Sequence, residues 1–590
     1  MSSFVYNDGN FEIQRPGEVF LTVGMFFDGT KNNRYHTEIR KKKEGIGEFR
    51  KRDKEEIEAM PDEDKQLYEQ TKRPDSELEL TEEEKKMLQK YGGEESFGND
   101  FTNVVRKYYA CEKEYRIYTE GIGTASPEDK DQSDSMGGFV WGRGVTGIIE
   151  KVRSGCADLA KKISKKVEEK KKKNPISKIT LIIDAYGFSR GAAAARFFLY
   201  QLQKEAYPFG WTNFKSNTDE FDKYSKQFKI DENGYLIEDN WLKEGLLPPL
   251  GILGIELLKA DVPRELIDTI FVKVRFLGIY DTVASYDPDC IVIPDFEGQV
   301  GKLHLHEIGD PQRAVHYTAI NEHRENFSLT RLKTEGFGDK RVERNFPGVH
   351  SDVGGSYNHD PLDEDTFYKQ AKEGKLYNRE KYPHTKNTCE YEIVSLREDL
   401  FFFINLTGFR KTLIKESWFN EDQIEVRYRW IPKFFKRKLM GERRLEGGYS
   451  FIPLHFMCEE AKKFVPELNE SKVLLDYPIN DLFLVGVKAH LRRHTIEGGK
   501  NWVITKPSQI YSSVPHQEER VTPYTNEEKE VKPTEEKSIN GGELKEVEVL
   551  SPNATLRRLR NRYLHWSAKL NTISDELGFA PAKDRKRHEF

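Results

Sequence analysis

A serine set between a strand and a helix is the feature of this sequence that most clearly predicts chemistry. Residues 187–191 read GFSRG, with Ser189 at the centre. The β-branched stretch 179–183 (ITLII) precedes this motif, and the alanine-rich stretch 192–200 (AAAARFFLY) follows it. A GxSxG sequence in this context is typical of a nucleophile elbow, the sharp turn that lifts a serine hydroxyl above the edge of a sheet. The alternative is a serine in an ordinary glycine-rich turn, but the flanking strand and helix favour the catalytic interpretation.

A serine hydroxyl is a weak nucleophile at neutral pH, so it needs a histidine base and an acid that orients the base. Asp281 comes directly after the apolar stretch 270–280, and His350 follows the stretch 341–346 in a glycine-bounded loop. The chain order Ser189, Asp281, His350 is the order of the triad in α/β-hydrolases. The sequence therefore predicts these three residues as a catalytic triad. A helix-capping Asp281 and a solvent-exposed His350 are the alternatives.

Other titratable residues compete for these roles. His316 and His323 lie in a segment that we expect to be helical over 314–324, and either could serve as the base. Their helical context favours a place in the core instead. Asp352 is an alternative carboxylate for the triad, whereas Asp184, which precedes the elbow, is expected to be structural.

The end of the first predicted strand is a candidate for stabilising negative charge on a substrate. Residues 19–27 form this strand, and Gly29 and Thr30 follow it closely. A backbone N–H from this loop could form an oxyanion hole together with the N–H of Arg190. The candidates Arg190, Gly29 and Thr30 rest on position alone. Chemistry of this kind requires no organic cofactor, and the five cysteines show no zinc-binding spacing, so we expect neither a cofactor nor a metal.

Strands and helices alternate along the first 360 residues. The predicted strands are 19–27, 115–118, 179–184, 270–280 and 341–346, and the predicted helices are 103–109, 142–173, 192–200 and 314–324. This alternation predicts an α/β fold, an α/β-hydrolase-like and mostly parallel sheet with helices on both faces. Ligands bind at the carboxyl ends of the strands in such sheets. Ser189, Asp281 and His350 are all expected at that edge.

With 590 residues the chain is too long for one simple core, so insertions or further domains are expected. We expect the following parts: a catalytic domain at 1–360 with a charged insertion at about 41–93 and a second insertion at about 207–265, a lid or a region contacting membrane or partner at 361–514, a disordered linker at 515–550, and a C-terminal region at 551–590. The last part contains a basic helix at about 556–570. We expect this helix to dock on the body through Tyr563, Leu564 and Trp566.

Composition limits the classes of partner. The chain has 94 Lys and Arg and 99 Asp and Glu, a net charge of -5, so no general attraction to polyanions follows. The lysine-rich end of the helix predicted at 142–173 has no aromatic residues interleaved, and we do not expect nucleic-acid binding.

Membrane contact is left open by the sequence. No stretch reaches the roughly 18 apolar residues of a membrane span. The nearest is 246–258, which we interpret as a buried loop and helix, the alternative being an apolar flap over a lipid site. The basic and aromatic stretch 427–438 (RYRWIPKFFKRK) fits a membrane interface or a loop packed on its own core, and both interpretations stay open.

The first eight residues (MSSFVYND) lack the basic start and apolar core of a secretory signal peptide. The cysteines are odd in number and far apart, which favours reduced thiols. The sequence therefore predicts synthesis in the cytoplasm, with any export by another route.

Four motifs together resemble a known family. They are FFDGTKNN at 26–33, GFSRGA at 187–192, GIYDTV at 278–283 and FPGVHSDVGG at 346–355. The region 19–357 resembles the first family of type VI secretion lipase effectors, whose α/β-hydrolase domain was long catalogued as a domain of unknown function (DUF2235).

The resemblance implies an antibacterial phospholipase A that acts on membrane glycerophospholipids in the periplasm or at the membrane of a neighbouring cell. It implies the same triad, Ser189, Asp281 and His350, and two partners, a VgrG-like spike protein for delivery and a cognate immunity protein. Two other functions stay open: a serine esterase acting on soluble esters without a secretion role, and a non-catalytic binding module.

Overall fold

A computed structural model of the protein gives the placement of most of the chain. It describes residues 17–49, 51–127, 131, 133, 147–172, 175–213, 227–284, 299–324, 327–358, 392–397, 406–431, 434–443, 445–504, 550–567, 587 and 589. The linker predicted at 515–550 lies outside the described residues except for Leu550, and so do the side chains of the basic and aromatic stretch 427–438.

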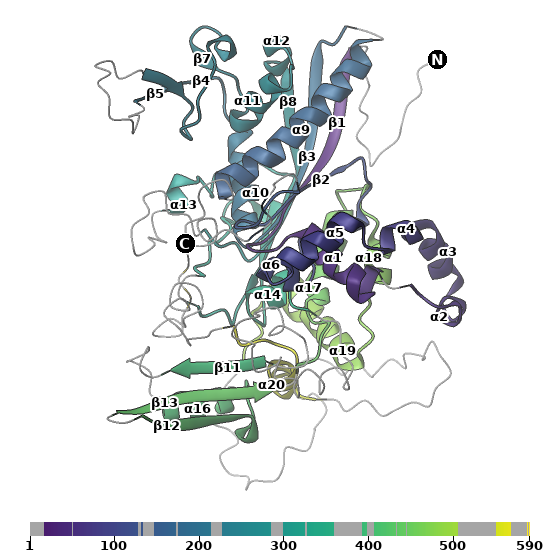
Figure 1. The fold of residues 1–590 in the computed structure, drawn as a ribbon, viewed down its shortest axis with the longest axis vertical. Coiled ribbons are helices and arrows are strands. Elements are labelled where there is room, and N and C mark those ends of the chain that lie inside the picture. Colours follow the sequence, from purple (N-terminus) through teal and green to yellow (C-terminus); the bar gives the residue numbers. More distant parts are fainter. Residues whose placement is uncertain are drawn as a thin grey trace.

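A six-stranded sheet forms the centre of the molecule, with all neighbouring strands parallel (Figure 1). In spatial order its strands are β10 (Arg341–Phe346), β9 (Arg313–Ala319), β8 (Ile270–Tyr280), β3 (Lys178–Phe188), β1 (Glu18–Phe27) and β2 (Arg116–Thr119). Parallel sheets carry helices on both faces, so their strands are rich in apolar residues throughout. The predicted α/β fold with a mostly parallel sheet is confirmed.

One prediction of secondary structure is wrong. We expected a helix over 314–324, but β9 (Arg313–Ala319) runs there between β8 and β10. Its sequence RAVHYTA is short, and a short apolar stretch does not distinguish a strand from a helix. Pairing with two neighbours decides the conformation, so His316 lies on a central strand instead of a helix.

Helices cover both faces of the sheet. On one face lie α9 (Ile148–Lys171), α10 (Arg190–Gln201) and α11 (Gly251–Lys259), and they share a core with Met25 and Phe27 of β1. Phe26 points to the other face, because successive side chains of a strand alternate.

The second face is covered by helices from distant parts of the chain. These are α7 (Asn103–Ala110) and α17 (Phe451–Lys462), with α18 (Glu470–Asp476) and α19 (Leu482–Leu491) beside them. A single hydrophobic cluster joins Phe26 to residues from 406 to 566. The described residues from 406 to 502 and from 556 to 566 therefore contribute to the core of the sheet.

The remaining α-helices and strands lie around the central sheet and the helices that cover it. They are α1 (Arg34–Glu44), α2 (Lys54–Glu58), α3 (Asp62–Thr71), α4 (Asp75–Leu78), α5 (Glu82–Tyr91), α6 (Glu95–Gly98), α12 (Arg264–Ile267), α13 (Gln299–Lys302), α14 (His350–Gly354), α16 (Leu406–Lys415), α20 (Pro552–Arg562), and the strands β4 (Tyr207–Pro208), β5 (Gly210–Asn213), β6 (Gln227–Ile230), β7 (Leu246–Leu247), β11 (Glu392–Arg397), β12 (Ile424–Ile431) and β13 (Phe434–Arg443). The charged insertion is helical, α1 to α5 lying together at one side of the molecule (Figure 1). The strands β11, β13 and β12 form a separate antiparallel sheet.

Two apolar segments occupy buried positions. The stretch 246–258 forms β7 and the buried helix α11, as expected for a loop and helix of the core. Tyr563, Leu564 and Trp566 follow α20 and are buried in the cluster on the second face. Among the described residues, no helix combines the length and the apolar character needed to cross a bilayer.

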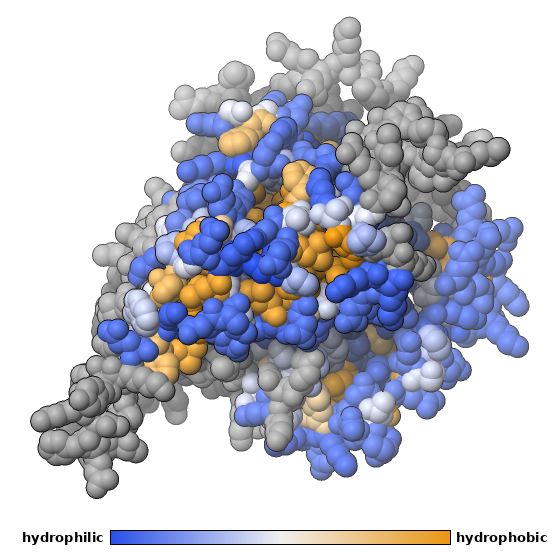
Figure 2. All heavy atoms as spheres, turned by 90° about the horizontal axis from the view of Figure 1, so that it is seen from above, coloured by the Kyte–Doolittle hydropathy of each residue, from blue (hydrophilic) through white to orange (hydrophobic). Residues whose placement is uncertain are grey.

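The surface seen from above is mixed, with hydrophobic patches bordered by hydrophilic residues (Figure 2). This pattern agrees with a chain of which 33% of the residues are charged and whose mean hydropathy is -0.74.

The first turn of α10 packs directly on the end of β1. A Cβ atom at Gly191 would lie 2.2 Å from the carbonyl oxygen of Asp28 and 2.4 Å from that of Phe27. These are backbone atoms, which cannot move aside like a flexible side chain. Only glycine lets the two elements approach so closely.

Gly191→Ala is therefore expected to lower the free energy of unfolding by about 1–3 kcal/mol, measured by urea denaturation. Gly93→Ala is the matched control, because a Cβ atom there would meet nothing within 4 Å, and a change of less than about 0.5 kcal/mol is expected. Helix propensity alone predicts that alanine stabilises α10. A Gly191→Ala protein as stable as the wild type would contradict the close approach.

Candidate active site

Ser189 lies between the end of β3 and the start of α10 in a strained backbone conformation. Its φ is 59° and its ψ is -129°, a region that residues with a side chain rarely occupy. Such strain at a strand-to-helix turn is typical of a nucleophile elbow. Ser189 is nearly buried, with 4% of its surface exposed.

Backbone hydrogen bonds fix Ser189 beside the end of β8. The N–H of Ser189 donates to the carbonyl of Tyr280 at 3.1 Å, and the carbonyl of Ser189 accepts from the N–H of Val283 at 3.3 Å. These two bonds flank Asp281, the residue that follows β8. The elbow and the Asp281 turn are thus held together as one unit.

Asp281 and His350 form a hydrogen-bonded pair. Oδ2 of Asp281 lies 2.5 Å from Nδ1 of His350, and Oδ1 accepts from the N–H of Ala319 at 2.9 Å. Burial alone would raise the pKa of the Asp281 carboxyl, but the charges and hydrogen bonds of Arg587 and His350 hold this pKa well below its usual range. Asp281 is therefore ionised although its surface is fully buried.

His350 is neutral in this site. Burial lowers the pKa of its imidazole below the ordinary value, against the opposing effect of Asp281. With Nδ1–H donating to Asp281, the lone pair lies on Nε2, which has no hydrogen-bond partner among the described residues. A neutral imidazole with a free Nε2 lone pair is the state that a general base requires. The rings of Phe188 and Phe327 pack against it, with centroids 4.5 and 5.1 Å away.

His316 is engaged at both ring nitrogens. Its Nδ1 lies 2.8 Å from Oε2 of Glu343, and its Nε2 accepts from the N–H of Thr282 at 3.1 Å. Neither nitrogen is available to a serine. His316 instead holds Thr282, the neighbour of Asp281, in place.

The other candidate residues also have structural partners. Asp352 lies 2.7 Å from Nδ1 of His565, and Nδ1 of His323 lies 2.9 Å from the carbonyl of Asn321. Asp184 accepts from the hydroxyl of Tyr115 at 2.8 Å and pairs with Arg275 at 2.5 Å. The described structure thus brings Asp281, and not Asp352 or Asp184, to His350.

The loop after β1 lies against the first residue of α10. Nε of Arg190 donates to the hydroxyl of Thr30 at 2.8 Å. The N–H of Gly29 donates to Oδ1 of Asp28 at 2.8 Å and is engaged there. Burial raises the pKa of Asp28 to about 6. The assignment of Arg190, Gly29 and Thr30 to an oxyanion hole stays a prediction.

Two charged residues at this site were missed by the sequence analysis. Oε2 of Glu322 accepts from the N–H of His350 at 3.2 Å, and the carboxylate also pairs with Arg324 at 2.8 Å. Arg587, near the C-terminus, donates to both carboxylate oxygens of Asp281. No motif marks Arg587, because it lies in the highly charged stretch 583–589 (KDRKRHE).

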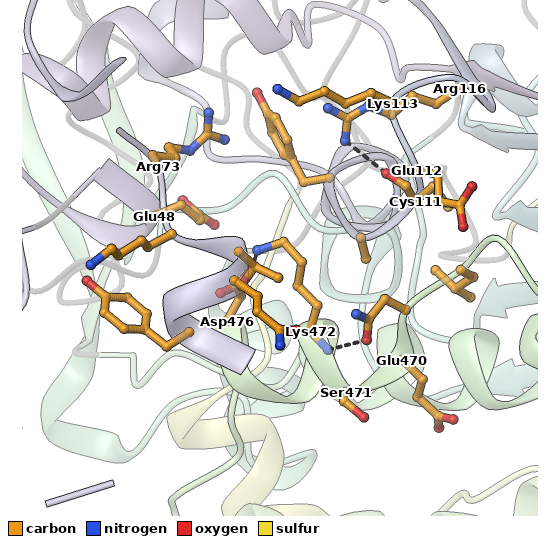
Figure 3. Close-up of a pocket in the computed structure, with 18 of the residues that line it drawn as sticks. Glu48, Arg73, Cys111, Glu112, Lys113, Arg116, Glu470, Ser471, Lys472 and Asp476 are labelled. Carbon is orange, nitrogen blue, oxygen red and sulfur yellow. Dashed lines mark hydrogen bonds and ion pairs between the residues drawn. The ribbon is translucent and has the colours of Figure 1, made fainter. Parts of the chain in front are cut away.

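A cavity of about 910 Å³ lies elsewhere, between the charged insertion, α7 and α18 (Figure 3). Its lining carries both signs of charge, including Arg73, Arg116, Glu48 and Asp476. None of the predicted triad residues lines it. Within the described part of the chain, no group of three or more His, Cys, Asp and Glu side chains is placed to hold a metal ion.

Residues 88–372 match the family model described as "T6SS, Phospholipase effector Tle1-like, catalytic domain". The chain carries a Tle1-like catalytic domain. The resemblance drawn from the four motifs is thereby confirmed. The Tle1-like segment contains Ser189, Asp281 and His350, whereas Gly29, Thr30 and the C-terminal Arg587 lie outside it.

Solved structures of similar proteins include the Tle1 effector bound to the VgrG spike from the type 6 secretion system. It is 16% identical, with a TM-score of 0.37 over 83% of this chain and 82% of that chain. An uncharacterized protein from Pseudomonas aeruginosa is 18% identical, with a TM-score of 0.26 over 58% of this chain and 42% of that one. A comparison with curated proteins found no match.

The two candidate carboxylates can be separated by the rate at which a fluorophosphonate labels Ser189. Asp281→Asn is expected to slow labelling roughly 10,000-fold, because the amide stabilises the wrong tautomer of His350 and no longer stabilises its cation. Asp352→Asn is expected to change the rate less than about tenfold, because Asp352 contacts His565. Circular dichroism of both variants controls for folding. The opposite ranking would move the acid to Asp352.

Proposed function

We propose that this protein is an antibacterial phospholipase A, a serine hydrolase that cleaves acyl esters of membrane glycerophospholipids. The Tle1-like domain supports the phospholipase class. The observation that carries the serine mechanism is the 2.5 Å pair of Asp281 and His350 beside the strained elbow of Ser189.

In the proposed reaction, Nε2 of His350 removes the proton of the Ser189 hydroxyl while Oγ attacks the acyl carbonyl carbon. Asp281 keeps Nδ1 protonated and stabilises the imidazolium that forms. Negative charge develops on the carbonyl oxygen, where backbone N–H groups near Arg190 and Thr30 would donate. No step requires a metal or an organic cofactor.

Collapse of the tetrahedral intermediate breaks the ester bond. His350 then donates its proton to the leaving oxygen of the lysophospholipid, and an acyl group remains on Ser189. Water, activated by His350 in the same way, releases the fatty acid and restores the serine. The strained backbone holds Ser189 in position throughout, so little reorganisation is needed.

The proposal includes delivery by a type VI secretion system, which the description of the matched domain supports. The protein is made in the cytoplasm, carried by a VgrG-like spike protein, and acts in the periplasm or at the membrane of a target cell. A cognate immunity protein protects the cells that make it.

Release of fatty acid from vesicles of phosphatidylethanolamine and phosphatidylglycerol tests the proposal. With position-labelled acyl chains, the wild type is expected to release fatty acid, and the labelled position gives the regiochemistry. Ser189→Ala is expected to lose at least about 10,000-fold in rate. Ser471→Ala is the matched control, because Ser471 is exposed and lies on α18.

The other outcomes separate the remaining functions. Faster hydrolysis of dispersed short-chain esters than of vesicles would indicate a soluble-ester hydrolase. No turnover of either substrate by the wild type, together with no fluorophosphonate labelling, would indicate a binding module. Equal activity of Ser189→Ala and the wild type would refute the serine mechanism.

A further inference from the structure

Arg587, near the end of the sequence, contacts the candidate active site. Nη1 of Arg587 donates to Oδ1 of Asp281 at 2.7 Å, and Nη2 donates to Oδ2 at 2.9 Å. The two residues are 306 positions apart in the chain. This is a two-point contact between a guanidinium and a carboxylate, the geometry in which arginine binds carboxylates most specifically.

Three further contacts hold Arg587 and Glu589 in place. Nε of Arg587 donates to the carbonyl of Phe327, the residue whose ring packs on His350. Glu589 forms a parallel bridge with Leu329 and pairs with Arg331 at 2.8 Å. These contacts fix the position of the Arg587 guanidinium. The side chain of Arg587 is nearly buried, with 6% of its surface exposed.

Asp281 needs a cation, because its side chain has no exposed surface. A buried carboxylate is costly unless it is paired and its lone pairs are satisfied. His350 is neutral and supplies a hydrogen bond without a full charge. Among the described residues, Arg587 is the one cationic side chain in hydrogen-bond contact with Asp281.

The contacts also use all the hydrogen-bond acceptor positions of the Asp281 carboxylate. Oδ1 accepts from the N–H of Ala319 and from Arg587, and Oδ2 faces His350 and Arg587. A carboxylate offers about four acceptor positions. With all four used, rotation of Asp281 away from Nδ1 of His350 would break several of these hydrogen bonds.

We propose that Arg587 is a positioning residue of the active site, which orients the Asp281 carboxylate toward His350 and stabilises its charge. It acts through Asp281 and touches neither substrate nor Ser189 in this role. The inference rests on the proposed serine mechanism, and it makes Arg587, which lies outside the matched catalytic domain, a part of the active site.

Several charged groups face the pair and set the expected pH dependence. Arg587 approaches from the C-terminal segment, Arg324 and Glu322 from the turn after β9, and His316 from β9 itself. Burial lowers the pKa of His350 most, and the charges of Arg324 and Arg587 lower it further. Loss of Arg587 removes one of these charges, so the pKa of His350 rises. Activity requires neutral His350, and the acidic limb of kcat/KM therefore moves to higher pH.

Arg587→Ala is expected to lower kcat about 10- to 100-fold on a dispersed short-chain ester, with KM unchanged, because a hydrogen-bonded charge pair is lost. Guanidinium ion added to this variant is expected to restore kcat to within a few fold of the wild-type value and to return the acidic limb of kcat/KM to its wild-type pH. Arg587→Lys is expected to be intermediate, since an ammonium cannot make the two-point contact. Arg557→Ala is the matched control, an exposed arginine that contacts Lys415 and Ser417.

Three results would overturn the inference. The first is an Arg587→Ala protein with the kcat of the wild type and an unmoved acidic limb of kcat/KM. The second is a loss of kcat that guanidinium does not restore, again with the acidic limb unmoved. The third is an Arg587→Ala protein with a higher kcat than the wild type. The last would show that Arg587 restrains Asp281 instead of supporting it. Failure of the proposed serine mechanism is distinguishable, because the wild type itself would then fail to label Ser189 with a fluorophosphonate.

Discussion

The ion pair and hydrogen bonds of a fully buried aspartate are the interaction on which the candidate site depends. Asp281 has no exposed surface, so its charge must be stabilised entirely by protein groups. The N–H of Ala319, the imidazole of His350 and the guanidinium of Arg587 do this. These groups come from β9, from α14 and from Arg587, so the position of Asp281 depends on residues that are far apart in the chain.

The order of strands explains how the reacting groups meet. β3, β8, β9 and β10 are successive neighbours, and Ser189 follows β3, Asp281 follows β8 and His350 follows β10. Parallel strands end at one edge, so residues distant in sequence converge there. β9 lies between β8 and β10. The N–H of Ala319 on this strand donates to the carboxylate of Asp281, and the imidazole of His316 accepts from the N–H of Thr282.

Much of the sheet could be predicted because its long strands are apolar and continuous. The predicted strands 270–280 and 341–346 coincide with β8 and β10. β9 could not be predicted, because seven residues satisfy a helix or a strand until neighbours pair with them. The order of Ser189, Asp281 and His350 marked the candidate triad, but Arg587 lies in a charged tail whose composition reads as solvated surface. Only the tertiary contact distinguishes it.

In the proposed mechanism, Ser189 carries the acyl group during turnover. Acid-quenched mixing of the wild type with phosphatidylethanolamine vesicles, followed by mass spectrometry of peptides, measures this directly. We expect one acyl chain on the peptide that contains Ser189, more of it at short times than at the end of the reaction, and none in Ser189→Ala. Fatty-acid release without an adduct under these conditions, or an adduct on another residue, would contradict it.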